Sequence, residues 1–311
     1  MRVGAIDCGT NSIRLLVADV GGPDLREVVR EMTVVRLGEG VDRTGAFSPA
    51  ALDRTFAACE EYAVTIDGLG VERLRFVATS ASRDVSNRSA FFDGVRERLG
   101  VAPEVISGAE EARLSFRGAV EGLPRERIAM PTLVVDIGGG STEFVLGGRG
   151  LTIDVEAAVS VNIGCVRMTE RHLHGDPPSH EEIARVESDV AAALDEASAA
   201  VPLERARSLV GVAGTVTTLV ALIHGLPAYE PAEIHGREAT LPEIDELTER
   251  LLAMPRAERA ELPVMHPGRV DVIGGGALVL RAIMRRTGLP VIASETDILD
   301  GVARSLADDV P

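Results

Sequence analysis

Near its middle, the sequence reads Thr132-Leu-Val-Val-Asp136-Ile-Gly138-Gly139-Gly140-Ser141-Thr142-Glu143-Phe-Val-Leu146. A short apolar run rich in β-branched residues ends at a carboxylate, passes through three glycines and a hydroxyl, and continues as strand-type residues. This pattern predicts a strand, a tight turn and a second strand. Taken alone, the stretch is equally well explained by an ordinary β-hairpin with a glycine turn.

Glycines at such a turn let the backbone approach a ligand closely, and successive N–H groups form a concavity that binds anions. Phosphate is the ligand that we expect at such a turn. Asp136 and Glu143 would then face a polyanion, which is unfavourable unless a divalent cation, typically Mg2+, lies between them. The stretch therefore suits a phosphate site with a metal ion next to these two carboxylates.

The same pattern occurs a second time, close to the start of the chain, as Ala5-Ile-Asp7-Cys-Gly9-Thr10-Asn11-Ser12-Ile-Arg-Leu-Leu-Val17. Both copies carry Asp, then Gly two residues on, then Ser five residues on, and then an apolar strand. Two hairpins with the same turn chemistry predict a two-lobed molecule that holds a phosphate chain from both sides.

The composition is that of a folded globular protein. The chain has 311 residues, of which 45% are hydrophobic, so it is long enough for two domains. No apolar run approaches the ~20 residues of a membrane span. Because Asp7 and the first glycine turn lie within the first twelve residues, we expect no signal peptide and a cytoplasmic protein that does not bind membranes.

The charged residues restrict the chemistry. All 32 basic residues are arginine, which excludes a Walker A lysine and a Schiff-base lysine. The net charge of −16 argues against nonspecific binding to nucleic acid or to anionic membranes. A polyanionic substrate would need a local site built from arginine, backbone N–H groups or metal. The three cysteines, an odd number without motif spacing, suit a reducing compartment.

Hydrophobic periodicity predicts a mixed α/β lobe in the first part of the chain. After the first hairpin we expect a strand over 25–37, a helix capped by Ser48 with Pro49 at its first position, and a strand over 71–79. A helix over 88–99, a strand over 101–106 and a helix from Ser107 follow. A break is expected near 122–130.

The second part repeats this plan. Strands are expected over 132–137, 142–147, 151–161 and 208–213, with a helix that starts at Ser179 in a capping box with Glu182. The stretch 225–240 is expected to be a loop, followed by helices from about 241 and 271. A last strand over 290–294 and a last helix over 297–308 complete the chain.

Glu110 and Glu111 lie in the first turn of a predicted helix. Ser107 and Glu110 have the spacing of a capping box, which leaves Glu110 a structural role and Glu111 none. Glu111 could therefore act as a general base that takes a proton from an attacking water. The alternative is that both carboxylates only stabilise the helix through its dipole.

Other candidates carry weaker signals. Arg83 follows a strand and could clamp phosphate, or could be a surface arginine. His172, His174 and His180 lack the spacing of a zinc site, so we expect them at the surface or in a weak contact with phosphate. The turns 211–218 and 274–276 enter helices and suit a phosphate or nucleotide, although glycine there also permits tight packing.

Four motifs together resemble the exopolyphosphatase/guanosine pentaphosphate phosphohydrolase (Ppx/GppA) family, within the actin-like ATPase and sugar kinase superfamily. They are Asp7-x-Gly-Thr-Asn-Ser, Ala78-Thr-Ser-Ala-Ser-Arg83, Ile106-Ser-Gly-Ala-Glu-Glu111-Ala-Arg and Asp136-Ile-Gly-Gly-Gly-Ser-Thr-Glu143. The resemblance covers nearly the whole chain and is greatest to short, two-domain actinobacterial-type exopolyphosphatases. Longer relatives carry a C-terminal helical region that this sequence lacks.

The resemblance implies a fold of two actin-like (ribonuclease H-like) lobes with mixed sheets and an active-site cleft between them. The first lobe would span residues 1–124 and the second 125–295, with the last helix, about 296–311, returning to the first lobe. A homodimer is also implied.

The resemblance further implies Mg2+-dependent hydrolysis of the terminal phosphoanhydride of inorganic polyphosphate, with Mn2+ as the other metal to consider. Glu111 would be the catalytic base, and Asp136 and Glu143 would be catalytic and hold the metal. Phosphate-binding positions would be Asp7, Gly9, Thr10, Asn11, Ser12, Arg83, Gly138, Gly139, Gly140, Ser141, Thr142, Gly214 and Thr215.

Three other functions remain open at this point. The nearest is hydrolysis of guanosine pentaphosphate (pppGpp) by the same chemistry. An actin-like ATPase or sugar kinase is disfavoured, because the glutamate pair supplies a base for water, whereas a kinase needs an acceptor pocket. A phosphate sensor without catalysis would tolerate Glu111→Gln.

Overall fold

The computed structural model describes residues 1–10, 12–21, 24–78, 85–149 and 153–308. The chain divides into two compact units. The first consists of Met1–Gly118 together with Ile298–Pro311, and the second of Ala119–Asp297. Each unit contains one sheet with helices, which confirms the predicted mixed α/β fold class.

The first unit is built on a five-stranded sheet in the order β3-β2-β1-β4-β5. Strands β1, β2 and β3 form an antiparallel meander, and β4 and β5 continue the sheet in parallel with β1. The strands are β1 (Arg2–Cys8), β2 (Ser12–Gly21), β3 (Asp24–Val34), β4 (Arg73–Ala78) and β5 (Glu104–Val105). The predicted order of elements in this part of the chain is therefore confirmed.

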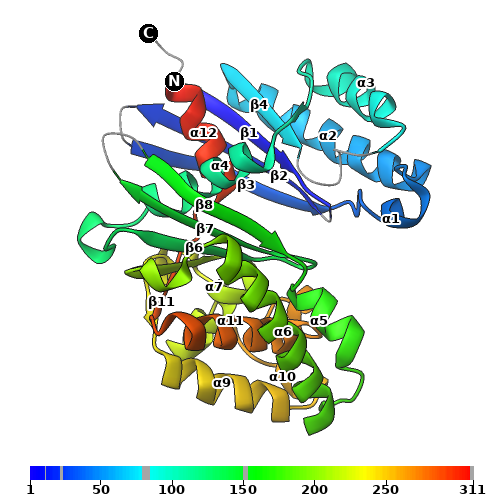
Figure 1. The fold of residues 1–311 in the computed structure, drawn as a ribbon. Helices are drawn as coiled ribbons and strands as arrows, with labels where there is room; N and C mark the ends of the chain where they lie inside the picture. Colours follow the sequence, from blue (N-terminus) through cyan, green and yellow to red (C-terminus); the bar gives the residue numbers. More distant parts are fainter. Residues whose placement is uncertain (11, 22–23, 79–84, 150–152, 309–311) are drawn as a thin grey trace. The chain divides into compact units, whose positions relative to one another are not determined.

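Helices cover both faces of this sheet (Figure 1). Alternate residues of β2 point to opposite sides, so Ile13, Leu15 and Val17 enter one core while Leu16, Ala18 and Val20 enter the other. Helices α2 (Pro49–Leu69) and α3 (Arg88–Leu99) pack on the first side, and α12 (Ile298–Asp308) packs on the second. Two further helices are α1 (Val41–Thr44) and α4 (Gly108–Glu121).

Local signals explain where these helices begin. The Ser48 hydroxyl accepts a hydrogen bond from Ala51 N–H at 3.2 Å, and Pro49 occupies the first turn of α2, as predicted. Gly70 ends α2 in the left-handed conformation, with φ of 66°.

The last helix is fastened to the first unit by contacts from residues far away in the sequence. Arg30 on β3 donates to the buried carboxylate of Asp300 at 2.9 and 3.0 Å. Arg73 on β4 donates to the carbonyl of Leu306 at 2.6 Å. Gly301 lies so close to α4 that a Cβ atom there would be 2.0 Å from Leu114 O, so glycine is required at this crossing.

The second unit is built on a six-stranded sheet in the order β10-β11-β9-β6-β7-β8. Its strands are β6 (Thr132–Ile137), β7 (Thr142–Arg149), β8 (Ile153–Val161), β9 (Ser208–Val212), β10 (Glu238–Ala239) and β11 (Val291–Ala293). Strands β6, β7 and β8 form an antiparallel meander, while β9 runs parallel to β6 and β11. The plan of the first unit is thus repeated.

The helices that form the core of this unit lie on one face of its sheet (Figure 1). They are α5 (Cys165–His172), α6 (His180–Ala200), α7 (Ala213–Ile223), α8 (Pro231–Ile234), α9 (Leu241–Ala253) and α11 (Ile273–Thr287); α10 (Arg256–Ala260) is a short addition. The predicted capping box of Ser179 and Glu182 at the start of α6 is present. Among the described residues, no helix combines the length and the apolar character that crossing a bilayer requires.

Two sequence-based expectations for secondary structure were wrong. The stretch 225–240 is not only loop, because Pro231 starts the short helix α8 and Glu238–Ala239 pairs with β11. The strand expected over 101–106 is reduced to Glu104–Val105, which pairs with the end of β4. Both differences reflect short elements that exist only through pairing or packing with distant residues.

Candidate active site

The two glycine hairpins share a backbone hydrogen bond across the turn. In the first, Gly9 N–H donates to Ser12 O at 3.0 Å, and in the second, Gly138 N–H donates to Ser141 O at 3.0 Å. In each, an aspartate lies near the end of the strand that leads into the turn. The predicted strand–turn–strand repeat is therefore confirmed within each unit.

The hairpins differ in the residue that faces the aspartate. Asp7 pairs across the strands with Arg14, whose Nη2 is 2.6 Å from Asp7 Oδ2. The equivalent partner of Asp136 is Glu143. Directly opposed like charges destabilise a sheet, whereas opposed unlike charges stabilise it. The first hairpin thus neutralises its carboxylate with an arginine, whereas the second places two carboxylates together.

Two hydroxyl groups orient Glu143. Ser141 Oγ donates to Glu143 Oε1 at 2.7 Å, and Ser160 Oγ on β8 donates to the same oxygen at 2.6 Å. Mg2+ prefers carboxylate oxygens and usually takes only one or two from the protein, completing its shell with water and substrate phosphate. The donor set of Asp136 and Glu143 fits this requirement.

The carbonyl groups of the second glycine turn all bind the start of α5. Cys165 N–H donates to Gly138 O at 2.9 Å and Arg167 N–H donates to Gly139 O at 3.0 Å. The side chain of Arg167 donates from Nε to Gly140 O at 2.6 Å. These bonds also satisfy N–H groups in the first turn of α5, which have no partner within the helix.

A planar trans peptide points its N–H opposite to its C=O. With the carbonyls of Gly138, Gly139 and Gly140 held toward α5, the N–H groups of Gly139, Gly140 and Ser141 point away from that helix. Within the described part of the chain, these three N–H groups donate to no other residue. The turn therefore presents backbone donors of the kind that bind phosphate.

Gly164 makes this contact possible. A Cβ atom at this position would be 2.4 Å from Gly139 O and 2.7 Å from Gly138 O, both backbone atoms that cannot move aside cheaply. Neither Gly164 nor Arg167 is among the predicted site residues. A glycine just before a short helix is visible in the sequence, but nothing local says that the helix binds a turn more than twenty residues earlier.

Gly214 and Thr215 lie at the start of α7, just beyond Val212, which pairs with Asp136. Arg269 covers Gly214, since its Nη2 would be 2.2 Å from a Cβ there. The guanidinium donates to Thr218 Oγ1 at 2.8 Å and stacks 5.4 Å from the Tyr229 ring centroid. Phosphate binding by these two residues stays a prediction.

The side chain of Thr215 takes part in packing. It is 6% exposed and lies against Gly276 of α11, where a Cβ would be 2.5 Å from Thr215 Cγ2. Gly274, Gly275 and Gly276 are all buried in α11. These glycines allow α11 to pack closely, Gly274 on α9, Gly275 on α5 and Gly276 on α5 and α7, which supports the alternative of tight packing; a phosphate or nucleotide role for them stays a prediction.

In the first unit, the glutamate pair lies in the first turn of α4. Ser107 Oγ accepts from Glu110 N–H at 3.2 Å, so Ser107 caps the helix as predicted. The Glu110 carboxylate, however, pairs with Arg113 at 2.9 Å and with Arg75 at 3.6 Å. The hydrogen bond from Arg113 lowers the pKa of Glu110. Glu110 therefore has a structural role, although with arginines rather than with the cap.

The remaining predicted residues are placed as follows. Glu111 is half-buried on α4, and its assignment as base stays a prediction. Gly9, Thr10 and Ser12 form the first glycine turn, with Thr10 O accepting from Gly38 N–H at 2.8 Å. Asn11 and Arg83 lie outside the described residues.

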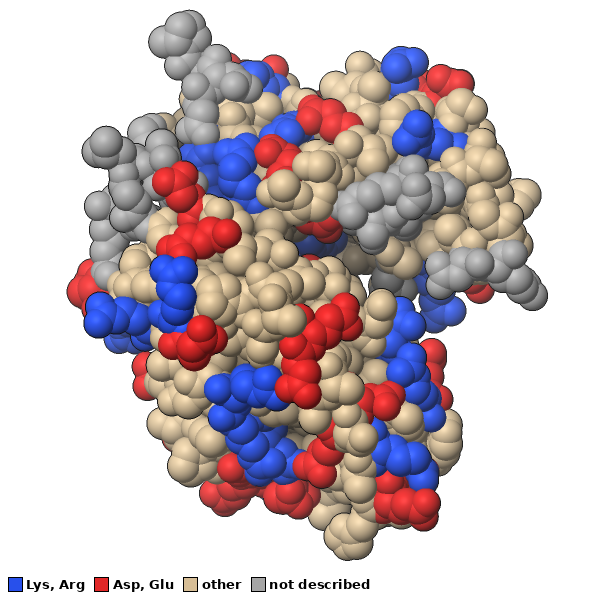
Figure 2. Space-filling view, viewed as in Figure 1, with Lys and Arg blue, Asp and Glu red and all other residues tan. Residues whose placement is uncertain are grey.

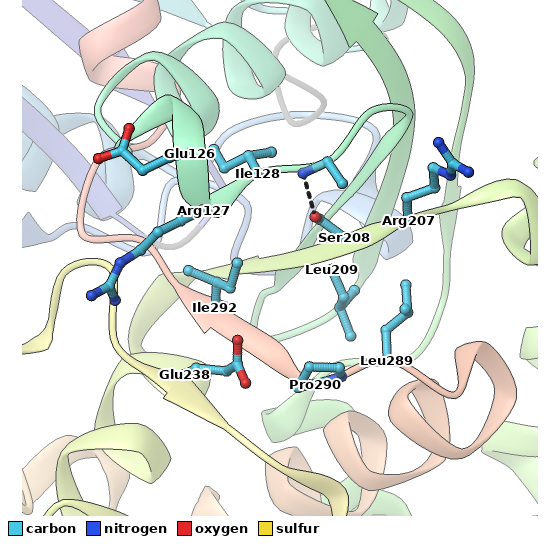
Figure 3. A pocket seen from close by; sticks show the side chains of 11 residues that line it. Glu126, Arg127, Ile128, Arg207, Ser208, Leu209, Glu238, Leu289, Pro290 and Ile292 are labelled. Atoms are coloured by element: carbon cyan, nitrogen blue, oxygen red, sulfur yellow. Dashed lines mark hydrogen bonds between the residues drawn. The ribbon is translucent and has the colours of Figure 1, made fainter.

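A cavity of about 300 Å³ lies at the opposite edge of the second sheet, where β9 and β11 begin (Figure 3). Apolar side chains make up much of its wall, and Arg127 on its rim donates to Gly236 O at 2.8 Å. Its lining residues are Glu126, Arg127, Ile128, Ala129, Arg207, Ser208, Leu209, Glu238, Leu289, Pro290 and Ile292. The lining is mixed polar and apolar, and none of these residues is a predicted site residue.

A backbone-donor turn beside two opposed carboxylates combines N–H groups of the kind that bind phosphate with oxygen ligands of the kind that Mg2+ prefers. Residues 15–304 match the Ppx/GppA phosphatase family. The chain is 51% identical over 320 residues to Exopolyphosphatase 2 of Mycobacterium tuberculosis, covering 98% of this chain and 98% of that protein. The protein belongs to the Ppx/GppA phosphatase family.

Solved structures agree with this assignment. The crystal structure of an exopolyphosphatase-like protein is 44% identical, with a TM-score of 0.85, and 98% of each chain is covered. The Aquifex aeolicus member of the Ppx/GppA family is 29% identical, with a TM-score of 0.86, covering 100% of this chain and 99% of that one.

Proposed function

We propose that this protein is an exopolyphosphatase that releases orthophosphate from the end of inorganic polyphosphate. The observation that carries the proposal is the second glycine turn, which presents three backbone N–H groups next to the opposed carboxylates of Asp136 and Glu143. The similarity to an enzyme named Exopolyphosphatase 2 supports the choice of substrate.

In the proposed reaction, the oxygen of a water molecule attacks the terminal phosphorus and the bond from that phosphorus to the bridging oxygen breaks. Glu111 accepts the proton of the water. The N–H groups of Gly139, Gly140 and Ser141 bind phosphoryl oxygens and stabilise the charge that they carry. Asp136 and Glu143 would hold Mg2+, or Mn2+, which would neutralise phosphate charge and orient the chain.

Arginine supplies positive charge around such a site in place of lysine. On the face shown in Figure 2, arginine and acidic side chains lie next to one another over much of the second unit. A polyphosphate chain would therefore be attracted by particular groups rather than by a general basic surface. Gly9, Thr10 and Ser12 are proposed to contribute to phosphate binding. Asp7, which pairs with Arg14, and Thr142, which is buried and donates to Ile163 O, are proposed to act by holding the two turns in place.

Hydrolysis of pppGpp is the second candidate, because the matching family carries both names. The remaining candidate functions are those of an actin-like ATPase, a sugar kinase and a phosphate sensor without catalysis. We further propose that the protein acts in the cytoplasm as a homodimer, which the family resemblance supports.

The test is phosphate release by the purified protein from short polyphosphate, long polyphosphate, pppGpp and ATP, each with Mg2+ and with EDTA. We expect Mg2+-dependent release from polyphosphate. A faster rate on pppGpp would favour the second candidate, and turnover of ATP alone would indicate an ATPase. No release from any of the four would leave the sensor as the function to pursue.

A further inference from the structure

The segment Ile163–Arg167, which we call the docking segment, holds the second glycine turn at several points. Thr142 Oγ1 donates to Ile163 O at 2.5 Å, and the backbone N–H groups of Cys165 and Arg167 donate to the turn at 2.9 and 3.0 Å. Gly164 allows the two backbones to touch. The turn is therefore oriented by a segment that itself carries none of the predicted site residues.

One of these contacts depends on a particular side chain. Gly138 O and Gly139 O accept from backbone N–H groups, which almost any residue could supply. Gly140 O accepts from Nε of Arg167 at 2.6 Å. This carbonyl belongs to the same peptide as Ser141 N–H, so the guanidinium determines which way that N–H points.

Glycine at position 140 makes such a constraint necessary. A glycine backbone turns more freely than any other, so the peptide between Gly140 and Ser141 could rotate if its carbonyl were released. Rotation would replace an N–H donor by a carbonyl oxygen on the side that receives phosphate, and two negatively polarised groups would then oppose each other. A charge-assisted hydrogen bond is strong enough to hold one orientation.

We propose that Arg167 is a positioning residue for the phosphate substrate. By holding Gly140 O, it aims Ser141 N–H at a phosphoryl oxygen. This inference deepens the proposed function and rests on it for the identity of the substrate. It assigns a task to a residue that was not among the predicted site residues.

The structure also supplies a compensating substitution. A Cβ atom on Gly140 would lie 3.3 Å from Nη2 of Arg167 and 4.0 Å from its Nε, so in the native protein alanine would press on the guanidinium. Gly140 is not in the left-handed region, so alanine can adopt its backbone conformation. Without the arginine side chain, alanine would meet no guanidinium there and would restrict rotation of the peptide.

The experiment compares Arg167→Ala, Gly140→Ala and the double variant with the native protein. Two quantities are measured: kcat and KM for polyphosphate, and the affinity for tripolyphosphate with Mg2+ by calorimetry, the latter with Glu111→Gln added to every protein so that turnover does not interfere. Arg171→Ala is the matched control, because Arg171 lies one turn further along α5, is 49% exposed and pairs with Asp189. Circular dichroism checks folding, and Arg167→Met, which keeps the aliphatic stem, replaces Arg167→Ala if that variant does not fold.

We expect Arg167→Ala to weaken tripolyphosphate binding and kcat/KM by about tenfold or more, the size of one charge-assisted hydrogen bond. Adding Gly140→Ala should restore part of this loss, whereas Arg171→Ala should change little. If Arg167 only stabilised the fold, Arg167→Ala would lower the unfolding midpoint, but adding Gly140→Ala would not restore binding.

Unchanged binding in Arg167→Ala would overturn the inference, as would a loss that Gly140→Ala does not reduce, because the guanidinium would then act in some other way. If the native protein binds tripolyphosphate but hydrolyses no polyphosphate, the proposed function fails while the binding experiment still tests Arg167.

Discussion

Asp136 and Glu143 are direct partners across strands β6 and β7, so two carboxylates lie side by side at the strand ends next to the glycine turn. The corresponding pair in the first hairpin consists of Asp7 and Arg14, which neutralise each other. The two hairpins share a backbone hydrogen bond but differ in the charge of the residue opposite the aspartate, and the metal ion that we propose at the second hairpin would reduce the repulsion between its two carboxylates.

Asp136→Asn should reduce turnover of polyphosphate by about 10²–10⁴-fold, the size expected for a lost catalytic group. The amide keeps the shape of the side chain but removes the negative charge that would hold a metal ion. The measurement is kcat with varied Mg2+. A variant with the native rate and the native Mg2+ requirement would show that Asp136 is not a ligand.

Mg2+ should raise the melting temperature of the native protein, since a ligand that binds only the folded state stabilises it. In EDTA, Glu143→Gln should melt at or above the native temperature, because the substitution removes the repulsion with Asp136. The rise in melting temperature on adding Mg2+ should be much smaller for Glu143→Gln than for the native protein. Thermal denaturation with and without the metal tests this, with Ser160→Ala as a control that leaves the charge in place. An equal Mg2+ shift in both proteins would argue against a site at this pair.

The two neighbouring glutamates of α4 should separate activity from stability. Glu111→Gln should abolish most of the turnover and leave folding intact, whereas Glu110→Gln should cost about 0.5–1 kcal/mol of stability through its partly exposed pairs with Arg113 and Arg75. Urea unfolding and phosphate release on both variants provide the comparison. If Glu110→Gln were the inactive one while fully folded, the two roles would have to be exchanged.

Glu182 should make stability depend on pH in acid. Hydrogen bonds from the N–H of Ser179, and next from His174, lower its pKa from 4.5 to about 2. A group whose pKa is lower in the folded state stabilises the fold above its unfolded pKa and loses that effect as the pH falls. Glu182→Gln should therefore unfold more easily than the native protein at neutral pH, and the two should converge between about pH 4.5 and 2. Parallel urea curves at several pH values measure this, and a constant difference would contradict it.

Gly301→Ala should destabilise the protein by about 1–3 kcal/mol, as expected for overpacking, because its Cβ would be 2.0 Å from the backbone oxygen of Leu114. Since α4 carries Glu111, a forced shift of this helix should also lower turnover. Gly68→Ala in α2 is the control, since nothing lies within 4 Å of its Cβ, and it should stabilise by up to about 1 kcal/mol. Equal effects of the two substitutions would mean that the crossing of α12 and α4 can adjust.

Much of the fold follows from local sequence. The apolar runs, the turn glycines and the caps at Ser48 and Ser179 predict the strands, hairpins and helices that the structure contains, because each of these signals acts within a few residues of its own position. The short elements α8 and β10 escaped prediction, since they depend on partners elsewhere in the chain.

The candidate site likewise combines features set by local sequence with features set by distant residues. The sequence by itself determined that two aspartate–glycine–serine turns exist and that carboxylates accompany the second one, because these residues are neighbours in the chain. Only the tertiary structure decided which side of the second turn carries free N–H groups, since that depends on Gly164 and Arg167, which bind it from a separate segment. Backbone direction in a glycine turn has almost no intrinsic preference, so distant hydrogen bonds determine it.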